Sequence, residues 1–268
     1  MTGRTPVALT IAGSDSGGGA GIQADLKTFA ALGVHGTSAL TALTAQNTLG
    51  VRAVHIVPAM IVTAQIDAVF EDFDVGAVKI GMLANLQIVE AVAGALRRHR
   101  PRFVVLDPVM IASSGDPLIA PEALSAMTAQ LFPVVDCLTP NLSEAAALLG
   151  RPITGDEAGM TEQGRALLAL GPRAVLMKGG HLESVEAADI LITPTGTRRY
   201  AGARSPSRNL HGTGCTLSAA IAANIVNGKR LEEAVGEAKA FVARAIEAGR
   251  GLTLGSGPGP LWQGPLRP

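Results

Sequence analysis

Glycine-rich segments that also carry hydroxyl, thiol or charged side chains are the first places in this sequence where chemistry is expected. The longest covers residues 12–21, Ala-Gly-Ser-Asp-Ser-Gly-Gly-Gly-Ala-Gly. It fails the phosphate-loop pattern, which from Gly13 would need lysine where the chain has Gly19. It also fails the dinucleotide fingerprint, which from Gly17 would need glycine or alanine where the chain has Ile22. Two interpretations stay open: a tight turn, or a loop whose backbone approaches or closes over a ligand.

A second glycine-rich segment, His211-Gly212-Thr213-Gly214-Cys215, precedes a long apolar run with helical character. Free N–H groups and the helix dipole at such an N-terminus would make Gly212, Thr213 and Gly214 an anion hole for a phosphoryl group. The same position lowers a thiol pKa, so Cys215 is a candidate base for the proton of a substrate hydroxyl. The alternative is that Cys215 is a small buried apolar residue.

Acidic and amide side chains follow two further apolar runs. Asp107 comes directly after residues 103–106, and Asn141 and Glu144 follow the run that ends at residue 138. Oxygen ligands of this kind suit Mg²⁺, which takes few carboxylates and keeps water and phosphate oxygens. The N-x-x-E spacing equally predicts a helix cap in which Asn141 and Glu144 bond reciprocally with the backbone. Both roles are compatible.

Two more polar side chains lie just after predicted strands. Lys178 precedes Gly179-Gly180-His181 and would reach a nucleotide phosphate as a point charge, or else be a solvated lysine in a turn. Gln46 precedes Asn47-Thr48, and its amide offers a donor and an acceptor that can read the edge of a heterocycle. Asn-Thr is also ordinary loop composition, so Gln46 alone predicts little.

The elements that must position these residues alternate between strand and helix. Short apolar runs predict strands, apolar residues at helical spacing predict helices, and Pro194-Thr195-Gly196 predicts a late hairpin. The alternation implies a mainly parallel sheet with helices on both faces, and ligands then bind beyond the carboxyl ends of the strands. Strands are expected at 7–12, 38–43, 51–57, 77–80, 103–106, 134–138, 174–177, 190–193 and 197–203, and helices at 22–30, 60–73, 86–99, 121–131, 142–149, 162–170, 213–226 and 231–248.

Composition limits the possible function classes. The chain has 268 residues, 47% of them hydrophobic, and 22 basic residues balance 22 acidic ones, which argues against nucleic-acid binding. No apolar stretch approaches the ~18 residues of a membrane span, and no signal peptide is evident. Two cysteines fit a reduced, cytoplasmic setting. We expect one domain over residues 1–254 and an irregular tail over residues 255–268.

Taken together and in this order, the segments resemble the hydroxymethylpyrimidine/phosphomethylpyrimidine kinase family of thiamine biosynthesis, within the ribokinase-like superfamily. The resemblance spans about residues 7–250. It implies a ribokinase-like α/β fold, a three-layer sandwich with a mainly parallel central sheet and helices on both faces. The matching segments are residues 12–27, 44–48, 79–83, 107–110, 141–144, 178–181 and 212–215.

The resemblance implies an ATP- and Mg²⁺-dependent kinase that phosphorylates 4-amino-5-hydroxymethyl-2-methylpyrimidine and then its monophosphate. Relatives are commonly dimers, so a homodimer is expected. Cys215 takes the position of the aspartate base of related sugar kinases, Lys178 contacts ATP phosphates, and Gln46 hydrogen-bonds the aminopyrimidine. The resemblance further assigns Gly212, Thr213 and Gly214 to the anion hole, Gly13, Ala20, Met82 and Val109 to the pyrimidine pocket, and Asp107, Asn141 and Glu144 to Mg²⁺, directly or through water.

Three other functions are consistent with parts of the pattern. A pyridoxal kinase of the same fold is the nearest, although residues 111–116 lack the lid-loop cysteine that some pyridoxal-active relatives carry. A nicotinamide-dependent dehydrogenase is disfavoured by the broken fingerprint. A pyrimidine-binding sensor without catalysis is disfavoured by the intact Lys178, Asp107 and Gly-Thr-Gly-Cys set.

Overall fold

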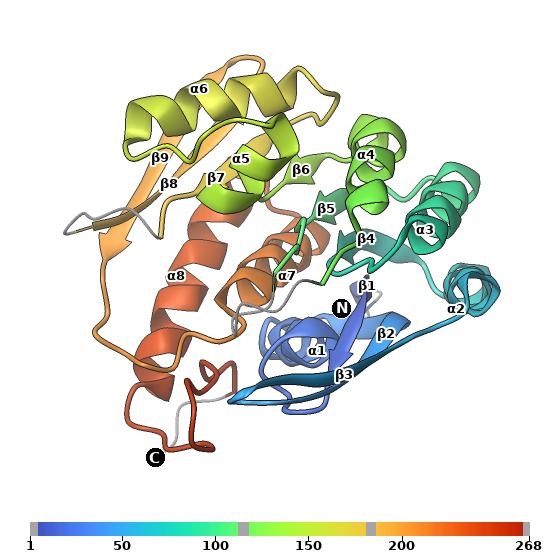
Figure 1. Cartoon of the computed structure of the whole chain (residues 1–268), viewed down its shortest axis with the longest axis horizontal. Coiled ribbons are helices and arrows are strands. Elements are labelled where there is room, and N and C mark those ends of the chain that lie inside the picture. The colour runs from blue at the N-terminus through green and yellow to red at the C-terminus, as the bar shows by residue number, and fades with distance from the viewer. Residues whose placement is uncertain (1–4, 112–117, 181–185, 265–268) are drawn as a thin grey trace.

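One continuous sheet runs through the computed structural model, which describes residues 5–111, 118–180 and 186–264 (Figure 1). The described strands form a nine-stranded sheet in the order β3-β2-β1-β4-β5-β6-β7-β8-β9. Its centre is parallel, whereas β3 at one edge and the β8–β9 hairpin at the other are antiparallel to their neighbours. The strands are β1 (Val7–Asp15), β2 (His35–Asn47), β3 (Gly50–Ile56), β4 (Val75–Ile80), β5 (Val104–Leu106), β6 (Cys137–Leu138), β7 (Val175–Lys178), β8 (Glu186–Thr193) and β9 (Gly196–Ala203).

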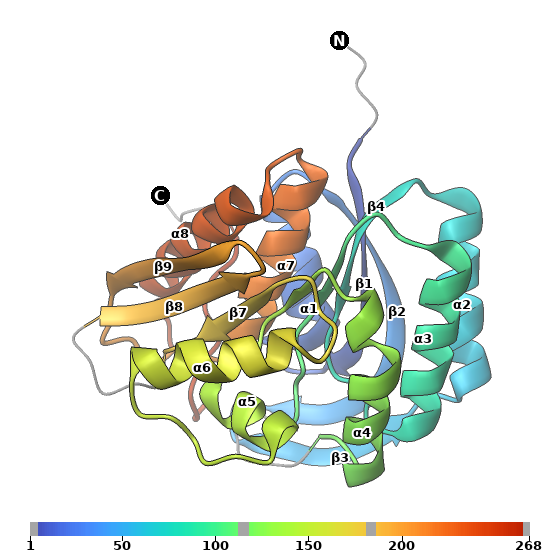
Figure 2. The same cartoon turned by 90° about the horizontal axis from the view of Figure 1, so that it is seen from above.

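Helices cover both faces of this sheet, as Figure 2 shows. Side chains of α1, α7 and α8 form one core with the sheet, and those of α2 to α6 form the other. The predicted three-layer α/β sandwich is therefore confirmed. The helices are α1 (Gly21–Ala31), α2 (Ala59–Asp72), α3 (Leu86–His99), α4 (Pro121–Gln130), α5 (Leu142–Leu149), α6 (Glu157–Leu168), α7 (Thr213–Val226) and α8 (Leu231–Gly249), with a 3₁₀ turn η1 (Phe132–Val134).

The strands bury both faces, which explains their nearly continuous apolar sequences. In β1, Leu9 and Ile11 point into the core with α2 to α6, whereas Ala8 points into the core with α7. Helix α7 has a buried run of small side chains, Ala219–Ala223 interrupted by Ile221, and packs against β1, β4 and β5. Small side chains permit close approach of a helix to a sheet, so α7 carries its N-terminus to the ends of the central strands.

Local signals place most element ends correctly. Asn85 caps α3 by accepting the Ile88 N–H at 3.0 Å, and Gly150 ends α5 with φ +61°. Helix α6 begins at Glu157, earlier than predicted, because the Asp156 side chain caps it through the Gly159 N–H at 2.7 Å.

Several strands differ in length from their predicted ranges, and β2 and β6 show why. Strand β2 extends beyond its predicted ends because β1 and β3 provide partners on both sides. Strand β6 has only two residues because the 3₁₀ turn η1 takes up the chain before it.

The C-terminal segment, residues 250–264, has no helix or strand but packs against the layers beside α7. Leu261 is fully buried, the Trp262 N–H donates to Ala245 O at 2.9 Å, and Gln263 reaches the Thr216 hydroxyl at 3.1 Å. Within the described part of the chain, no helix has the length and apolar character needed to cross a membrane.

Candidate active site

The motif residues meet at one edge of the sheet, where the parallel strands end. Asp15 ends β1, Met82 follows β4, Asp107 follows β5, Asn141 follows β6 and Lys178 ends β7. The Lys178 N–H donates to Pro140 O at 2.9 Å, which aligns the last two of these strand ends. Because the strands are parallel and adjacent, segments far apart in the sequence are brought together there.

Lys178 lies between two carboxylates. Its Nζ is 2.6 Å from Asp107 Oδ1 and 3.8 Å from Glu144 Oε2, and the side chain is only 13% exposed. The alternative of a solvated lysine in a turn is therefore wrong. Burial opposes the charge, but Asp107 and Glu144 outweigh it and raise the pKa of the Lys178 ammonium above its ordinary value. Lys178 is thus a fixed positive charge at the end of β7.

Asn141 and Glu144 form the predicted capping box at the start of α5. Asn141 Oδ1 accepts the Glu144 N–H at 2.8 Å, and Glu144 Oε2 accepts the Asn141 N–H at 2.7 Å. Burial raises the pKa of Glu144 to about 7, against the opposing effect of Lys178. Asn141 is thus occupied with the backbone, so any contact with a metal passes through water.

The donor set fits Mg²⁺ better than a metal held by protein alone. Asp107 and Glu144 are both buried and both face Lys178. Nowhere in the described ranges do three His, Cys, Asp or Glu side chains gather as a metal cluster. An ion held here would take one or two carboxylates and complete its shell with water and phosphate oxygens, as Mg²⁺ does.

The N-terminus of α7 faces this charged group. Gly212 caps the helix with φ +86°, and a side chain there would collide with the carbonyl oxygen of Gly19. A Cβ on Gly214 would lie 3.3 Å from Lys178 Nζ and 3.4 Å from Asp107 Oδ2. Glycine at these positions therefore lets the helix N-terminus approach the Lys178–Asp107 pair.

The N–H groups of this helix turn are not all free. The Thr213 N–H and hydroxyl both donate to Leu210 O, at 3.2 and 2.6 Å. In the part of the chain that the structure describes, the N–H groups of Gly214 and Cys215 have no hydrogen-bond acceptor. The same holds for the Gly212 N–H, so an anion at this N-terminus would be held by Gly212, Gly214 and Cys215, with Thr213 shaping the turn.

Cys215 is partly exposed, yet protein surrounds most of its thiol. This burial raises the pKa of the thiol to about 11, and the carboxylates of Asp25 and Asp107 add to the effect. Lys79 and the Gly21 N–H act in the opposite direction. The expectation that the helix N-terminus makes Cys215 a thiolate is therefore wrong for the protein without ligands, because desolvation exceeds the dipole effect.

A small apolar cluster borders the same edge. Met82 packs with Ala42 and Val109, and a Cβ on Gly13 would lie 3.0 Å from the Met82 sulfur. Three residues predicted for the pyrimidine pocket, Gly13, Met82 and Val109, are thus brought together. The fourth, Ala20, lies beside Gly212: a Cβ added to Gly212 would be 3.5 Å from the Ala20 Cα.

The loop over residues 15–20 is folded around its own carboxylate. Asp15 Oδ1 accepts the Gly17 N–H at 2.8 Å, and Oδ2 accepts those of Gly19 and Ala20 at 3.0 and 2.9 Å. Burial opposes ionisation, but bonds from His211, Ala20 and Gly17 lower the pKa of Asp15. These N–H groups are therefore not available to a ligand.

Gln46 lies beside this loop at a register shift of β2 against β3. Its backbone is fixed by Ser16, whose hydroxyl accepts the Gln46 N–H at 2.8 Å and donates to Gln46 O at 2.6 Å. Its side-chain amide lies between Thr44 and His211. A bulge of this kind re-aims a side chain, which accounts for the placement of Gln46 at the strand end.

A fully buried ion pair beneath the site is not among the predicted residues. Lys79 Nζ lies 2.8 Å from Asp25 Oδ2, which also accepts the Thr10 hydroxyl at 2.6 Å, and both charged side chains are 0% exposed. Asp25 raises the pKa of Lys79 against burial. The signal was available: Lys79 interrupts an apolar strand, and Asp25 shares a helix face with Ile22 and Phe29.

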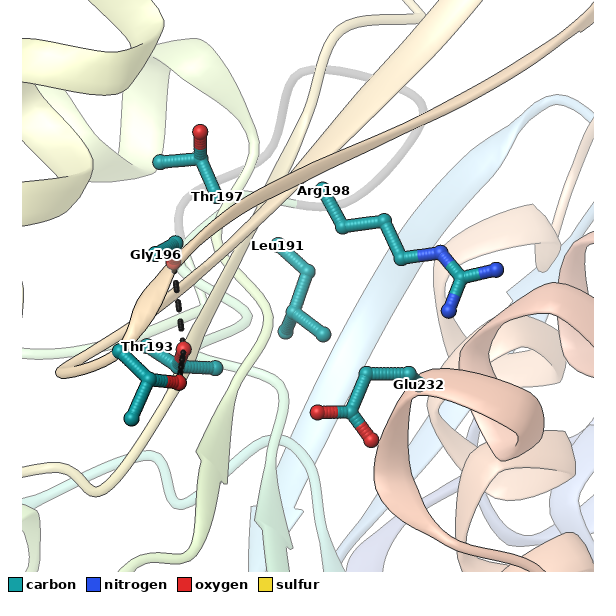
Figure 3. Close-up of a pocket in the computed structure, with 7 residues that line it drawn as sticks. Leu191, Thr193, Gly196, Thr197, Arg198 and Glu232 are labelled. Atoms are coloured by element: carbon teal, nitrogen blue, oxygen red, sulfur yellow. Dashed lines mark hydrogen bonds between the residues drawn. The ribbon is translucent and has the colours of Figure 1, made fainter.

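A shallow pocket of about 220 Å³ lies away from this chemistry (Figure 3). Arg198 and Glu232 line it from β9 and α8. Strands β7 and β8 are antiparallel: Val175, which begins β7, pairs with Ile192, and Lys178, which ends β7, pairs with Asp189. Thr193 follows Ile192 and also lines the pocket, so the pocket lies near the start of β7. This pocket is therefore at the opposite edge from Lys178, and we place the active site by its charged groups.

Two predictions concern residues outside the described ranges. These are His181, which follows the glycine pair after Lys178, and most of the lid segment 111–116.

Sequence comparisons give one consistent family. The family model described as phosphomethylpyrimidine kinase matches residues 15–262. A hydroxymethylpyrimidine/phosphomethylpyrimidine kinase of Rhizobium meliloti (strain 1021) is 55% identical over 257 residues, which is 96% of each chain.

Solved structures are similar over nearly the whole chain. The phosphomethylpyrimidine kinase of Clostridium difficile 630 has 44% identity and a TM-score of 0.80, covering 90% of this chain and 99% of its own. The pyridoxal kinase of Bacillus subtilis, solved as an ADP complex, has 34% identity and a TM-score of 0.90, covering 97% of this chain and 98% of its own.

Proposed function

The chain belongs to the phosphomethylpyrimidine kinase family, and we propose that it uses ATP to phosphorylate 4-amino-5-hydroxymethyl-2-methylpyrimidine and then its monophosphate in thiamine biosynthesis. The family and the kinase activity predicted from the motifs are thereby confirmed, and the dehydrogenase alternative is excluded. The observation that carries the proposal is the convergence of the Lys178–Asp107 pair, Cys215 and the open N-terminus of α7 at one strand edge.

Phosphoryl transfer needs positioning and charge stabilisation more than covalent chemistry. Lys178 binds the ATP phosphates, and its charge is available because burial and Asp107 hold it in one place. The N–H groups of Gly212, Gly214 and Cys215 bind the transferring phosphoryl group, with Thr213 shaping the loop. The substrate hydroxyl attacks the γ-phosphate in line from the side of Cys215.

Mg²⁺ would be held by Asp107 and Glu144, with Asn141 contributing through water. When bound, it neutralises charge on the phosphate oxygens. The support is the pair of buried carboxylates on either side of Lys178.

Cys215 accepts the hydroxyl proton in this proposal. Because its thiol pKa is about 11 without ligands, the thiolate is scarce at neutral pH, and turnover should rise with pH across the range in which the protein is folded. Cys215→Ala should lower kcat by about a hundredfold or more while leaving substrate affinity nearly unchanged. Turnover within a few-fold of wild type would remove the base role.

The pyrimidine lies against Gly13, Ala20, Met82 and Val109, with Gln46 reading its polar edge. Two of these residues support an aliphatic pocket: Met82 and Val109 pack together there. The sequence has one Trp, one Tyr and six Phe, so recognition relies on the amide and aliphatic side chains more than on ring stacking.

Pyridoxal phosphorylation is the second candidate, because a pyridoxal kinase shares this fold with a TM-score of 0.90. One assay separates the possibilities: ATP consumption with the hydroxymethylpyrimidine, its monophosphate or pyridoxal. We expect turnover with both pyrimidines and a much lower rate with pyridoxal. Preference for pyridoxal would reverse the assignment, and binding of the pyrimidine without ATP consumption would indicate a sensor.

The protein forms a homodimer in the cytoplasm, in this proposal. Exposed apolar residues on edge strand β3 and the adjoining α2 support the dimer: Val54 is 43% exposed, Ile56 41% and Met60 76%. The two free cysteines are compatible with a reducing compartment. Light scattering should give twice the mass of one chain, and in Ile56→Lys the measured mass should fall toward that of a single chain. A wild-type monomer at micromolar concentration would overturn the dimer.

A further inference from the structure

Gln46, the proposed reader of the pyrimidine, is part of a small polar network whose proton directions can be worked out. This inference therefore rests on the proposed function. His211 Nε2 lies 3.0 Å from Asp15 Oδ2 and 3.5 Å from Gln46 Nε2. The His211 and Asp15 side chains are 11% and 4% exposed, so water has little access to the contact between them.

Asp15 can only accept hydrogen bonds. Backbone N–H groups of Gly17, Gly19 and Ala20 all donate to its oxygens, an arrangement that requires the ionised carboxylate. A carboxylate carries no proton, so the proton in its contact with His211 must be on Nε2 of the imidazole. His211 Nε2 is therefore a donor, and it has no lone pair to offer Gln46.

The amide of Gln46 must then present its oxygen to His211. Two donors 3.5 Å apart make no hydrogen bond, and the two ends of a carboxamide have nearly the same shape. Rotating the amide by a half turn puts Oε1 beside His211 Nε2 and the NH₂ group beside Thr44 Oγ1. The Thr44 hydroxyl can accept that N–H because it donates to Ser14 O at 2.9 Å. Each group named here then has a matching partner.

Both ends of the network are fixed by backbone contacts. The backbone N–H of His211 donates to Gly259 O at 3.2 Å, and His211 O accepts the Leu261 N–H at 3.4 Å. The C-terminal segment therefore fixes the backbone of this residue. Ser16 holds the Gln46 backbone on the other side. The amide orientation is therefore set before a substrate binds.

We propose that His211, oriented by Asp15, is a specificity-determining residue that fixes the Gln46 amide with its oxygen toward His211 and its nitrogen toward Thr44. The amide oxygen retains one lone pair and accepts the 4-amino group of the pyrimidine. The amide nitrogen retains one N–H and donates to the ring nitrogen next to that amino group. The aminopyrimidine thus binds with its amino group on the His211 side.

The test compares two ligands that differ only in the amino group. Affinities for 4-amino-5-hydroxymethyl-2-methylpyrimidine and for 5-hydroxymethyl-2-methylpyrimidine are measured by calorimetry without ATP. In His211→Leu, the amide is free to turn, so the Kd of the amino ligand should rise about tenfold or more. The Kd of the ligand without the amino group should rise clearly less, because that ligand has only the ring-nitrogen bond to lose. Leu210→Ala, at the exposed neighbouring position, should leave both affinities as in wild type.

Other outcomes overturn the inference. An equal loss for both ligands means that His211 only shapes the pocket, and no loss for either means that it does not orient Gln46. If His211→Leu does not fold, Thr44→Val removes the second anchor of the amide and should give the same selective loss. A wild type that binds neither ring overturns the proposed substrate as well, whereas wild-type binding with equal losses overturns the role of His211 alone.

Discussion

The buried Asp25–Lys79 pair gives a stability prediction whose size follows from the structure. In Lys79→Met, the Asp25 carboxylate stays in the core with only the Thr10 hydroxyl as a partner, and its Oδ1 has no partner even in the intact protein. The methionine side chain is apolar and of similar length, so the main change is the loss of the charge. Both charged side chains are 0% exposed, so water cannot compensate.

Breaking a buried ion pair from one side costs about 3–5 kcal/mol, because it leaves an uncompensated charge in a low-dielectric interior. At roughly 2–4 °C per kcal/mol for a chain of this size, the Tm should fall by about 6–20 °C. Asp25→Asn combined with Lys79→Met removes both charges and keeps an acceptor for Thr10. The double variant should regain at least half of the lost stability.

Urea unfolding at neutral pH, followed by circular dichroism, measures the free energy of unfolding lost in Lys79→Met and regained in the double variant. Lys229→Met is the matched control, because its pair with Glu233 is on the surface, with side chains 43% and 58% exposed. That variant should lose less than about 1 kcal/mol. The reasoning is refuted if Lys79→Met costs no more than Lys229→Met, or if the double variant is as unstable as Lys79→Met alone.

Three further predictions concern groups around the site. Burial raises the pKa of Glu144 from 4.5 to about 7, so the folded protein holds a proton that the unfolded chain releases, and stability should fall as pH rises through this window. Glu144→Gln should flatten that dependence in urea unfolding, and equal slopes in the two proteins would contradict it. With a thiol pKa of about 11, Cys215 should react with iodoacetamide at a rate still rising at about pH 9, and a plateau near neutral pH would show a thiolate. Cys215→Ser should abolish labelling, because Cys137 is buried with a pKa of about 12. Gln263→Leu removes the 3.1 Å bond to the buried Thr216 hydroxyl and should cost about 1–3 kcal/mol, largely recovered when Thr216→Val is added; an unrecovered loss would assign the effect to packing instead.

Much of the fold follows from local sequence. The alternation of apolar runs with helical periodicity predicts the layered sheet, and Asn85, Asn141 and Gly150 mark helix ends through contacts with residues only a few positions away. Their chemistry acts within one helical turn, so it can be recognised without knowledge of the tertiary structure. The strand ends that carry Asp107 and Lys178 could also be predicted, because short apolar runs mark those strands in the sequence.

The sequence alone determined which residue types stand at the strand ends, and with the family pattern it indicated a kinase. Only the tertiary structure decided the state of those residues. It pairs Lys178 with Asp107 and surrounds the Cys215 thiol with protein, which reverses the pKa shift expected from the helix N-terminus. It also brings His211 to Asp15 across 196 residues. Charge, burial and proton position depend on neighbours in space, and the strand order of the sheet selects those neighbours.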